Sequence, residues 1–216
     1  MLKKIIKENL KKIIFKYTKI GSPTYSYNLD PLQLAEIINS LEKVKNIEGV
    51  ICEIGVARGM TTRFICEYLE NRDEQPKFYC FDTFNSFAKE DIQYEVEKRN
   101  KTKSELIGFS YNDFEKWKNN FKQFDFVKAI KKDIKNFDFE EIQPIKFALL
   151  DVDLYLPTLS ALNNLKNNMA KGGILMVDDV SKDNSWDGAN QAFHEFVEQH
   201  SLKFKLIGKK CGVIEF

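Results

Sequence analysis

The chain has 216 residues, 43% of them apolar, and its 33 basic and 32 acidic residues leave a formal charge of +1. This length fits one domain with a sizeable core, and the near-zero charge gives no general reason to expect a nucleic-acid partner. The four cysteines have no CxxC or CxxH spacing, so we expect a reduced, cytoplasmic protein without zinc. No apolar run reaches the roughly 18 residues that cross a bilayer, and the lysine-rich N-terminus does not fit a signal peptide.

Two helices are predicted in an N-terminal extension over residues 1–45. Residues 2–17 place apolar side chains at helical spacing with lysines between them, which predicts a basic amphipathic helix. Such a helix can pack on the same or a neighbouring subunit, which favours a homo-oligomer, or make weak contact with a membrane surface. Residues 21–23 (Gly-Ser-Pro) end it, and a second helix begins at Asp30 and Pro31, which suit an N-cap and a first helical turn.

Strand and helix patterns alternate over residues 46–216, which predicts one doubly wound, mostly parallel sheet of seven strands. The expected strands are 50–54, 77–81, 126–130, 146–152 and 174–177, followed by an antiparallel pair at 204–207 and 212–216. The expected helices are 60–70, 111–122, 157–170 and 188–199. Residues 84–110 are charged and lack a clear period, so we expect a helical lid there. Ligands of such sheets bind beyond the carboxyl ends of the strands.

A glycine loop follows the first of these strands, in the run Glu53–Gly59 (EIGVARG). Glycines let a backbone turn sharply and approach a ligand closely, and the next helix begins with free N–H groups. The loop is neither a P-loop nor a complete GxGxxG motif, and a purely structural turn explains it equally well. Asp82, at the end of the second strand, could accept hydrogen bonds from ribose hydroxyls or cap a loop. Together these features favour an adenosine-containing ligand without separating NAD from S-adenosylmethionine (SAM).

Three further aspartates follow two neighbouring strands: Asp151, Asp178 and Asp179. Carboxylates brought together repel strongly unless a cation lies among them, and oxygen ligands favour Mg²⁺, Mn²⁺ or Ca²⁺ over zinc. Such a metal can lower the pKa of a bound hydroxyl, which helps methyl transfer to oxygen and is not needed for hydride transfer. The pattern therefore favours a methyltransferase over an NAD-dependent oxidoreductase. Asp178 and Asp179 could instead merely cap a strand.

Three runs resemble the macrocin O-methyltransferase family: EIGVARG at 53–59, LLDVDLYLPT at 149–158 and GGILMVDDV at 172–180. Its members are class I, metal-dependent sugar O-methyltransferases, and the resemblance covers residues 49–216. It implies SAM and Mg²⁺ or another divalent cation as cofactors, and a sugar or glycan precursor as the small-molecule acceptor. It also implies that Asp151, Asp178 and Asp179 bind the metal and that Asp153 is the general base.

The resemblance assigns the SAM-binding positions to the strand ends and the loops after them: Glu53, Gly55, Val56, Gly59, Asp82, Thr83 and Asp133. The third-strand region departs from the family pattern, because Ala129 and Ile134 stand where Gly and Thr are expected, and residues 84–110 show no match. Other acceptors, such as a phenol, a phosphate derivative or an amine, therefore stay open, as does a non-catalytic binding module. Trp186 could border the substrate or pack in the core.

Overall fold

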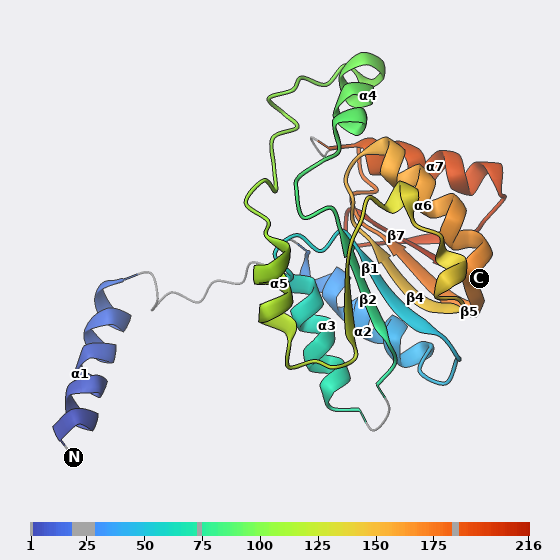
Figure 1. The fold of residues 1–216 in the computed structure, drawn as a ribbon. Helices are drawn as coiled ribbons and strands as arrows, with labels where there is room; N and C mark the ends of the chain where they lie inside the picture. The colour runs from blue at the N-terminus through green and yellow to red at the C-terminus, as the bar shows by residue number, and fades with distance from the viewer. Residues whose placement is uncertain (1, 19–28, 73–74, 183–185) are drawn as a thin grey trace.

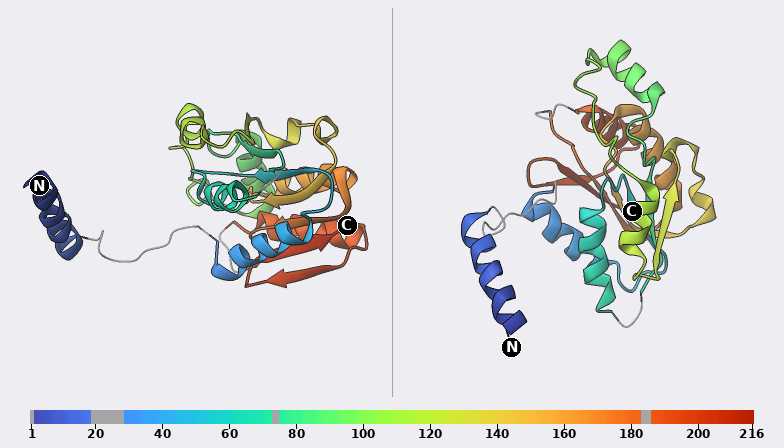
Figure 2. Two further views of the ribbon diagram at one scale, coloured as in Figure 1. Left: turned by 90° about the horizontal axis from the view of Figure 1, so that it is seen from below. Right: turned by 60° about the vertical axis from the view of Figure 1, so that its left-hand side comes forward.

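The computed structural model describes residues 2–18, 29–72, 75–182 and 186–216. Seven strands form one sheet in the order β3-β2-β1-β4-β5-β7-β6. Its five parallel strands are β1 (Val50–Ile54), β2 (Phe78–Asp82), β3 (Val127–Lys131), β4 (Ile145–Leu150) and β5 (Met169–Val177). The antiparallel pair β6 (Phe204–Ile207) and β7 (Cys211–Glu215) completes one edge (Figure 2). The predicted doubly wound, mostly parallel α/β fold is confirmed.

Helices cover both faces of the sheet (Figure 1). One apolar cluster joins the sheet to α2 (Pro31–Lys43), α3 (Met60–Glu70) and α5 (Phe114–Phe121). A second joins its other face to α6 (Tyr155–Asn168) and α7 (Gly188–Gln199). Strands enclosed in this way must be apolar on both faces, which explains why all six residues of β4 are buried.

The helix α2 begins as the sequence predicts. The Asp30 carboxylate accepts hydrogen bonds from the backbone N–H groups of Leu32 and Gln33, and the Gln33 side chain accepts one from the Asp30 N–H. This capping box satisfies donors that a helix start would otherwise leave unpaired. The prediction assigned α2 to an N-terminal extension, yet Ile37 and Leu41 lie in the core of the sheet. The helix is therefore part of the body that carries the site.

Several predicted boundaries are wrong by a few residues, among them both ends of α6 and the start of β5. The helix expected from Pro157 begins at Tyr155, with Pro157 inside its first turn, where a missing N–H costs nothing. It ends at Asn168 because Met169 already pairs with Ile145 and begins β5. Boundaries of this kind depend on strand pairing, which local sequence does not encode.

Residues 84–110 contain one helix, α4 (Lys89–Arg99), which is fastened to the body. The buried Glu95 carboxylate accepts hydrogen bonds from the Tyr155 N–H at the start of α6 (2.8 Å) and from Arg99 Nε (2.7 Å). Arg99 also pairs with Asp187, the residue before α7 (2.8 Å). The hydrogen bond to Glu95 and the ion pair with Asp187 hold α4 over the ends of α6 and α7, next to the carboxyl ends of the parallel strands.

The N-terminal helix α1 (Leu2–Tyr17) has the predicted limits and lies apart from the sheet in every view (Figures 1 and 2). The predicted linker at 21–23 falls outside the described residues. Among the described residues, no helix combines the length and the apolar character needed to cross a membrane.

Candidate active site

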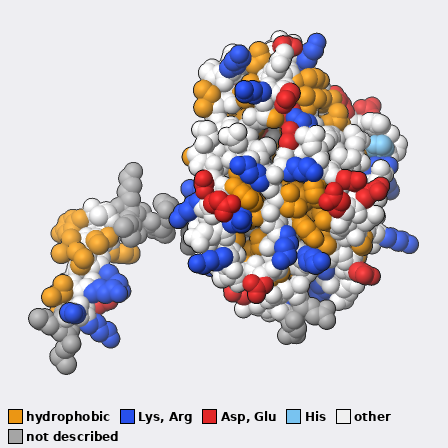
Figure 3. Space-filling view, in the orientation of Figure 1, with side chains coloured by type: hydrophobic (Ala, Val, Ile, Leu, Met, Phe, Trp, Pro, Cys, Tyr) orange, Lys and Arg blue, Asp and Glu red, His pale blue; other side chains and the backbone are white. Residues whose placement is uncertain are grey.

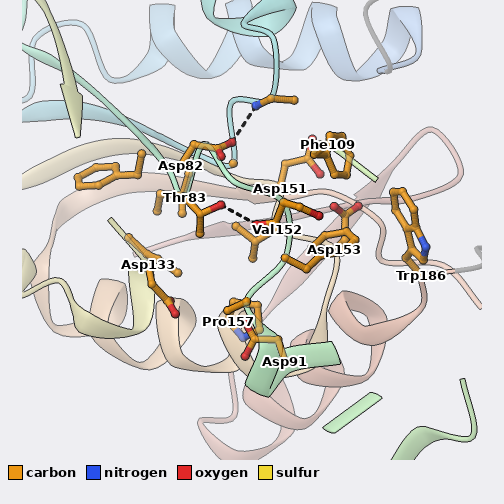
Figure 4. Close-up of a pocket in the computed structure, with 18 of the residues that line it drawn as sticks. Asp82, Thr83, Asp91, Phe109, Asp133, Asp151, Val152, Asp153, Pro157 and Trp186 are labelled. Carbon is orange, nitrogen blue, oxygen red and sulfur yellow. Dashed lines mark hydrogen bonds between the residues drawn. The ribbon is translucent and has the colours of Figure 1, made fainter. Parts of the chain in front are cut away.

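A cavity of about 330 Å³ opens at the carboxyl ends of the parallel strands. Eight of the predicted site residues line it: Gly55, Asp82, Thr83, Asp133, Asp151, Asp153, Asp178 and Asp179. The other three, Glu53, Val56 and Gly59, are buried and do not belong to the lining. Figure 4 shows Asp82, Thr83 and Asp133 on one side of Asp151 and Asp153, with Trp186 on the other side. The cavity thus has two ends, joined by a cluster of acids.

The first glycine of the glycine loop lies in close contact with the backbone at the end of β4. Gly55 has φ +87°, and a Cβ placed there would lie 1.7 Å from the carbonyl oxygen of Asp151. A side chain at this position would therefore push the ends of β1 and β4 apart. This contact brings the loop to the base of the cavity beside Asp151.

Asp82 anchors the same loop to the end of β2. Its carboxylate accepts hydrogen bonds from the N–H groups of Val56 (3.1 Å), Ala57 (2.9 Å) and Phe84 (2.7 Å). A carboxylate offers about four acceptor positions, so these three contacts leave room for roughly one more donor. Asp82 therefore already holds the glycine loop and the start of the next loop, and the predicted ribose hydroxyl could use only its remaining acceptor position.

Glu53 faces away from the cavity, although we expected the strand-end acids to share one edge. Side chains alternate across a strand, and Ile51, two residues earlier on β1, packs in the cluster under α3. Glu53 is 1% exposed, and its Oε2 atom has no hydrogen-bond partner among the described residues. Burial raises its pKa to about 8. Glu53 is thus an uncharged, buried acid beneath the glycine loop at neutral pH.

Three aspartates form the acidic cluster of the cavity: Asp151, Asp153 and Asp179. One carboxylate oxygen from each lies within 4.8 Å of the others. Asp153 (φ +61°) and Asp179 (φ +59°) follow the ends of β4 and β5 in the left-handed region, which aspartate tolerates better than most residues. Strained backbone of this kind concentrates at functional sites. The strands thus end in two tight bends that turn both carboxylates toward Asp151.

Asp178, predicted as a metal ligand, is engaged elsewhere. Its Oδ1 accepts a hydrogen bond from Gln33 Nε2 on α2, and its Oδ2 pairs with Lys210 Nζ at 2.8 Å. Lys210 also pairs with Asp179, at 2.7 Å. The structure therefore groups Asp153, our predicted base, with Asp151 and Asp179. Asp178 lines the same cavity and shares Lys210 with Asp179, and both of its carboxylate oxygens already have partners.

Crowding and burial change the protonation of this cluster. The pKa values of Asp151 and Asp153 are raised well above the usual range, first by burial and then by the neighbouring aspartates. Burial by itself would lower the pKa of Lys210, but Asp178 and Asp179 raise it. Burial and mutual repulsion therefore favour the protonated forms of Asp151 and Asp153, and a bound cation would allow these carboxylates to ionise together.

Three aromatic rings form a wall at the other end of the cavity, which we call the aromatic wall: Phe87, Phe109 and Trp186. Each ring touches the other two, with centroids 5.4–5.6 Å apart, and Trp186 Nε1 donates a hydrogen bond to the Glu105 carbonyl. Of the three, we had singled out only Trp186. Phe87 and Phe109 lie in 84–110, where sequence periodicity gave no signal.

Lys210 was also missed, because nothing in its local sequence marks it. It lies in the turn between β6 and β7, and antiparallel pairing of β7 with β5 brings that turn beside the end of β5. The approach of Lys210 to Asp178 and Asp179 is therefore a result of sheet topology alone.

Similar proteins carry the same fold. The family model for Macrocin-O-methyltransferase (TylF) matches residues 17–210. CalS11, a calicheamicin methyltransferase, is 18% identical with a TM-score of 0.65, and the O-methyltransferase NovP is 22% identical with a TM-score of 0.64. Each alignment covers 85% of this chain and 78% of the other.

A second structure of CalS11 describes it as a TDP-rhamnose 3'-O-methyltransferase; it is 19% identical with a TM-score of 0.60, over 85% of this chain and 79% of the other. SMU.1697c from Streptococcus mutans, solved in complex with SAH, is 15% identical with a TM-score of 0.51, over 83% of this chain and 96% of the other. No curated protein matches in sequence. Since the family model spans nearly the whole chain, the protein is a methyltransferase that belongs to the macrocin O-methyltransferase family.

Proposed function

We propose that this methyltransferase uses SAM and a divalent cation to methylate a hydroxyl group of a sugar or sugar-containing small molecule. The observation that carries the proposal is the acidic cluster of Asp151, Asp153 and Asp179, which lies between the glycine-loop end of the cavity and the aromatic wall. Membership of the family and the described activity of CalS11 support the sugar acceptor.

SAM would bind at the end lined by Gly55, Asp82, Thr83 and Asp133. Seven aspartates and two lysines line the cavity, so its field favours the positively charged sulfonium group of SAM. This charge balance supports SAM over the dinucleotide that the glycine loop by itself left open. Asp133 caps a short 3₁₀ turn through the Lys135 N–H, which keeps its carboxylate at the edge of the cavity.

The donor set of the acidic cluster fits a hard divalent cation. Three buried or half-buried carboxylates offer one oxygen each, with no nitrogen or sulfur ligand among them, and such sites suit Mg²⁺ and Mn²⁺. A cation held by Asp151, Asp153 and Asp179 would lower the pKa of an acceptor hydroxyl. Lys210 would keep its contact with Asp178, which lies outside this set.

Asp153 is our proposed proton acceptor. It lies between Asp151 and Trp186, so it faces the end of the cavity that is free for the acceptor (Figure 4). A carboxylate has two oxygens, so one can contribute to the cation site while the other takes the hydroxyl proton as the methyl group is transferred.

The acceptor would bind against the aromatic wall. The C–H faces of a sugar ring pack well on aromatic rings, and the cluster would receive a hydroxyl from the ring's edge. The helix α4 contributes here, because the hydrogen bond from the Tyr155 N–H to Glu95 and the ion pair between Arg99 and Asp187 fix the helix that follows Phe87. The four buried, unpaired cysteines support the cytoplasmic location that we propose for the enzyme.

The test measures cation binding and methyl transfer separately. After treatment with EDTA, the full chain is titrated with Mn²⁺ and with S-adenosylhomocysteine by calorimetry. We expect both to bind, and Asp179→Asn to weaken Mn²⁺ at least about 10-fold while S-adenosylhomocysteine binds as before. Asp153→Asn should weaken Mn²⁺ in the same way, whereas Asp178→Asn should not, which separates the observed cluster from the ligand set predicted from the sequence.

Methyl transfer is then assayed with labelled SAM and a panel of neutral glycosides, nucleotide sugars, including TDP-rhamnose, and simple phenols. Turnover should stop with EDTA and return with Mg²⁺ or Mn²⁺. Full turnover in EDTA would refute the role of the cation, and turnover with phenols alone would refute the sugar acceptor.

A further inference from the structure

The helix α1 presents a continuous apolar stripe to solvent. Ile6, Leu10, Ile13 and Tyr17 follow one another at spacings of four, three and four residues, so they lie on one face of the helix. They are 59%, 56%, 56% and 72% exposed. Single exposed apolar residues are common, but an aligned row on one short helix marks a binding face.

The rest of α1 is strongly basic. Six lysines and a single acid, Glu8, occupy its 16 residues, and Glu8 pairs with Lys11 at 2.9 Å. Figure 3 shows the apolar side chains of α1 gathered on one side and its lysine side chains on another. The helix therefore combines an apolar stripe with a field that attracts negative charge.

The family match does not cover this helix. The family match begins at residue 17, where α1 ends, and the cavity is lined only by residues from 54 onward. The apolar stripe therefore serves neither the catalytic fold nor the cavity, and its partner must lie outside them.

The charges of α1 disfavour a second copy as that partner. In a paired helix with the stripe as its seam, the flanking positions are Lys7, Asn9, Ile14 and Lys16, and none of them is an acid that could pair with lysine. Two copies would bring like charges together, over only about two heptads, fewer than the three or four that a coiled coil needs. A nucleic acid would use the lysines but leave the apolar stripe in water.

We propose that α1 binds the surface of an anionic lipid bilayer. The apolar stripe would enter the boundary between headgroups and acyl chains, and the lysines would contact anionic headgroups. An amphipathic helix with lysines beside its apolar face suits this position, because lysine can extend its ammonium group to the interface. The methyltransferase domain would thereby be held at the membrane surface.

The test is flotation of the full chain with vesicles. We expect it to bind vesicles of equal parts phosphatidylcholine and phosphatidylglycerol, to bind pure phosphatidylcholine at least about 10-fold more weakly, and to dissociate as salt is raised. Leu10→Asp should weaken binding to the anionic vesicles at least about 10-fold. Phe15→Asp is the matched control: it makes the same kind of change on the opposite side of the helix, so it should weaken binding no more than about threefold.

Several outcomes would overturn the proposal. They are equal loss of binding in Leu10→Asp and Phe15→Asp, equal binding to neutral and anionic vesicles, and no vesicle binding at all. A dimer that Leu10→Asp converts to a monomer in sedimentation velocity, together with no vesicle binding, would identify a second copy as the partner. Binding of S-adenosylhomocysteine by both variants should match the native chain, which shows that the domain is folded and keeps this test independent of the proposed reaction.

Discussion

Glu53→Gln should stabilise the protein, and more strongly as the pH rises. Glu53 is buried with one carboxylate oxygen unpaired among the described residues, and burial raises its pKa from 4.5 to about 8. In the unfolded chain the group ionises near its ordinary pKa, while in the folded chain it keeps its proton up to about pH 8. Between these values the unfolded state binds fewer protons, so the free energy of unfolding falls as the pH rises. Glutamine has nearly the same shape, keeps one oxygen that can accept a hydrogen bond from Thr62, and never ionises.

The size of the effect follows from the pKa shift. Each pKa unit corresponds to about 1.4 kcal/mol. Ionisation of Glu53 in the unfolded chain therefore lowers the free energy of unfolding by about 1 kcal/mol at about pH 5.5 and by about 4 kcal/mol at about pH 8. The free energy of unfolding of Glu53→Gln, relative to that of the native protein, should therefore grow by about 3 kcal/mol between these two pH values. In a chain of this length, this change should raise the melting temperature of Glu53→Gln relative to that of the native protein by about 8 °C more at pH 8 than at pH 5.5.

The assay compares urea unfolding of the two proteins at both pH values, without SAM or divalent cations, which would stabilise the folded state. The buried aspartates of the acidic cluster also titrate, but they are present in both proteins and cancel in the difference. Glu70→Gln, on the exposed end of α3, is the matched control and should show no such trend. An advantage that stays constant with pH would refute the reasoning, because Glu53 would then be ionised in the folded protein.

Three other substitutions test the remaining parts of the structure. Gly55→Ala should cost at least about 3 kcal/mol in urea unfolding, because its Cβ would meet the Asp151 carbonyl oxygen, whereas Gly108→Ala, which meets only a side chain at 3.3 Å, should cost about 1 kcal/mol or less. Equal costs would contradict the close-contact argument. Trp186→Ala should raise the KM for the acceptor about 10-fold and leave the KM for SAM unchanged, so an equal rise in both would show that the aromatic wall does not belong to the acceptor. Asp30→Ala should destabilise the fold by about 1 kcal/mol through loss of the helix cap, while Asp30→Asn should retain most of the stability; if both behave alike, the cap contributes nothing.

Local sequence was enough to predict the elements of the sheet. Apolar runs such as that of β4, and the cap at Asp30, are properties of a few consecutive residues, and the structure confirms both. The carboxyl ends of parallel strands meet at one edge, so the sequence also predicted that Asp82, Asp151 and Asp179 would share a cavity, and they do. The family was recognised from the same strand ends, and the family match confirms it.

The direction of each side chain at those strand ends was decided only by tertiary structure. Glu53 faces α3 because side chains alternate along β1, and the left-handed bends at Asp153 and Asp179 determine which carboxylates meet. Asp178 accepts a hydrogen bond from Gln33, 145 residues away in the chain, and pairs with Lys210, 32 residues away. The sequence thus determined which chemistry is available at the edge of the sheet. The packing of α2 and of the β6–β7 turn decided which side chains contact those acids, because such contacts form only when distant segments are brought together.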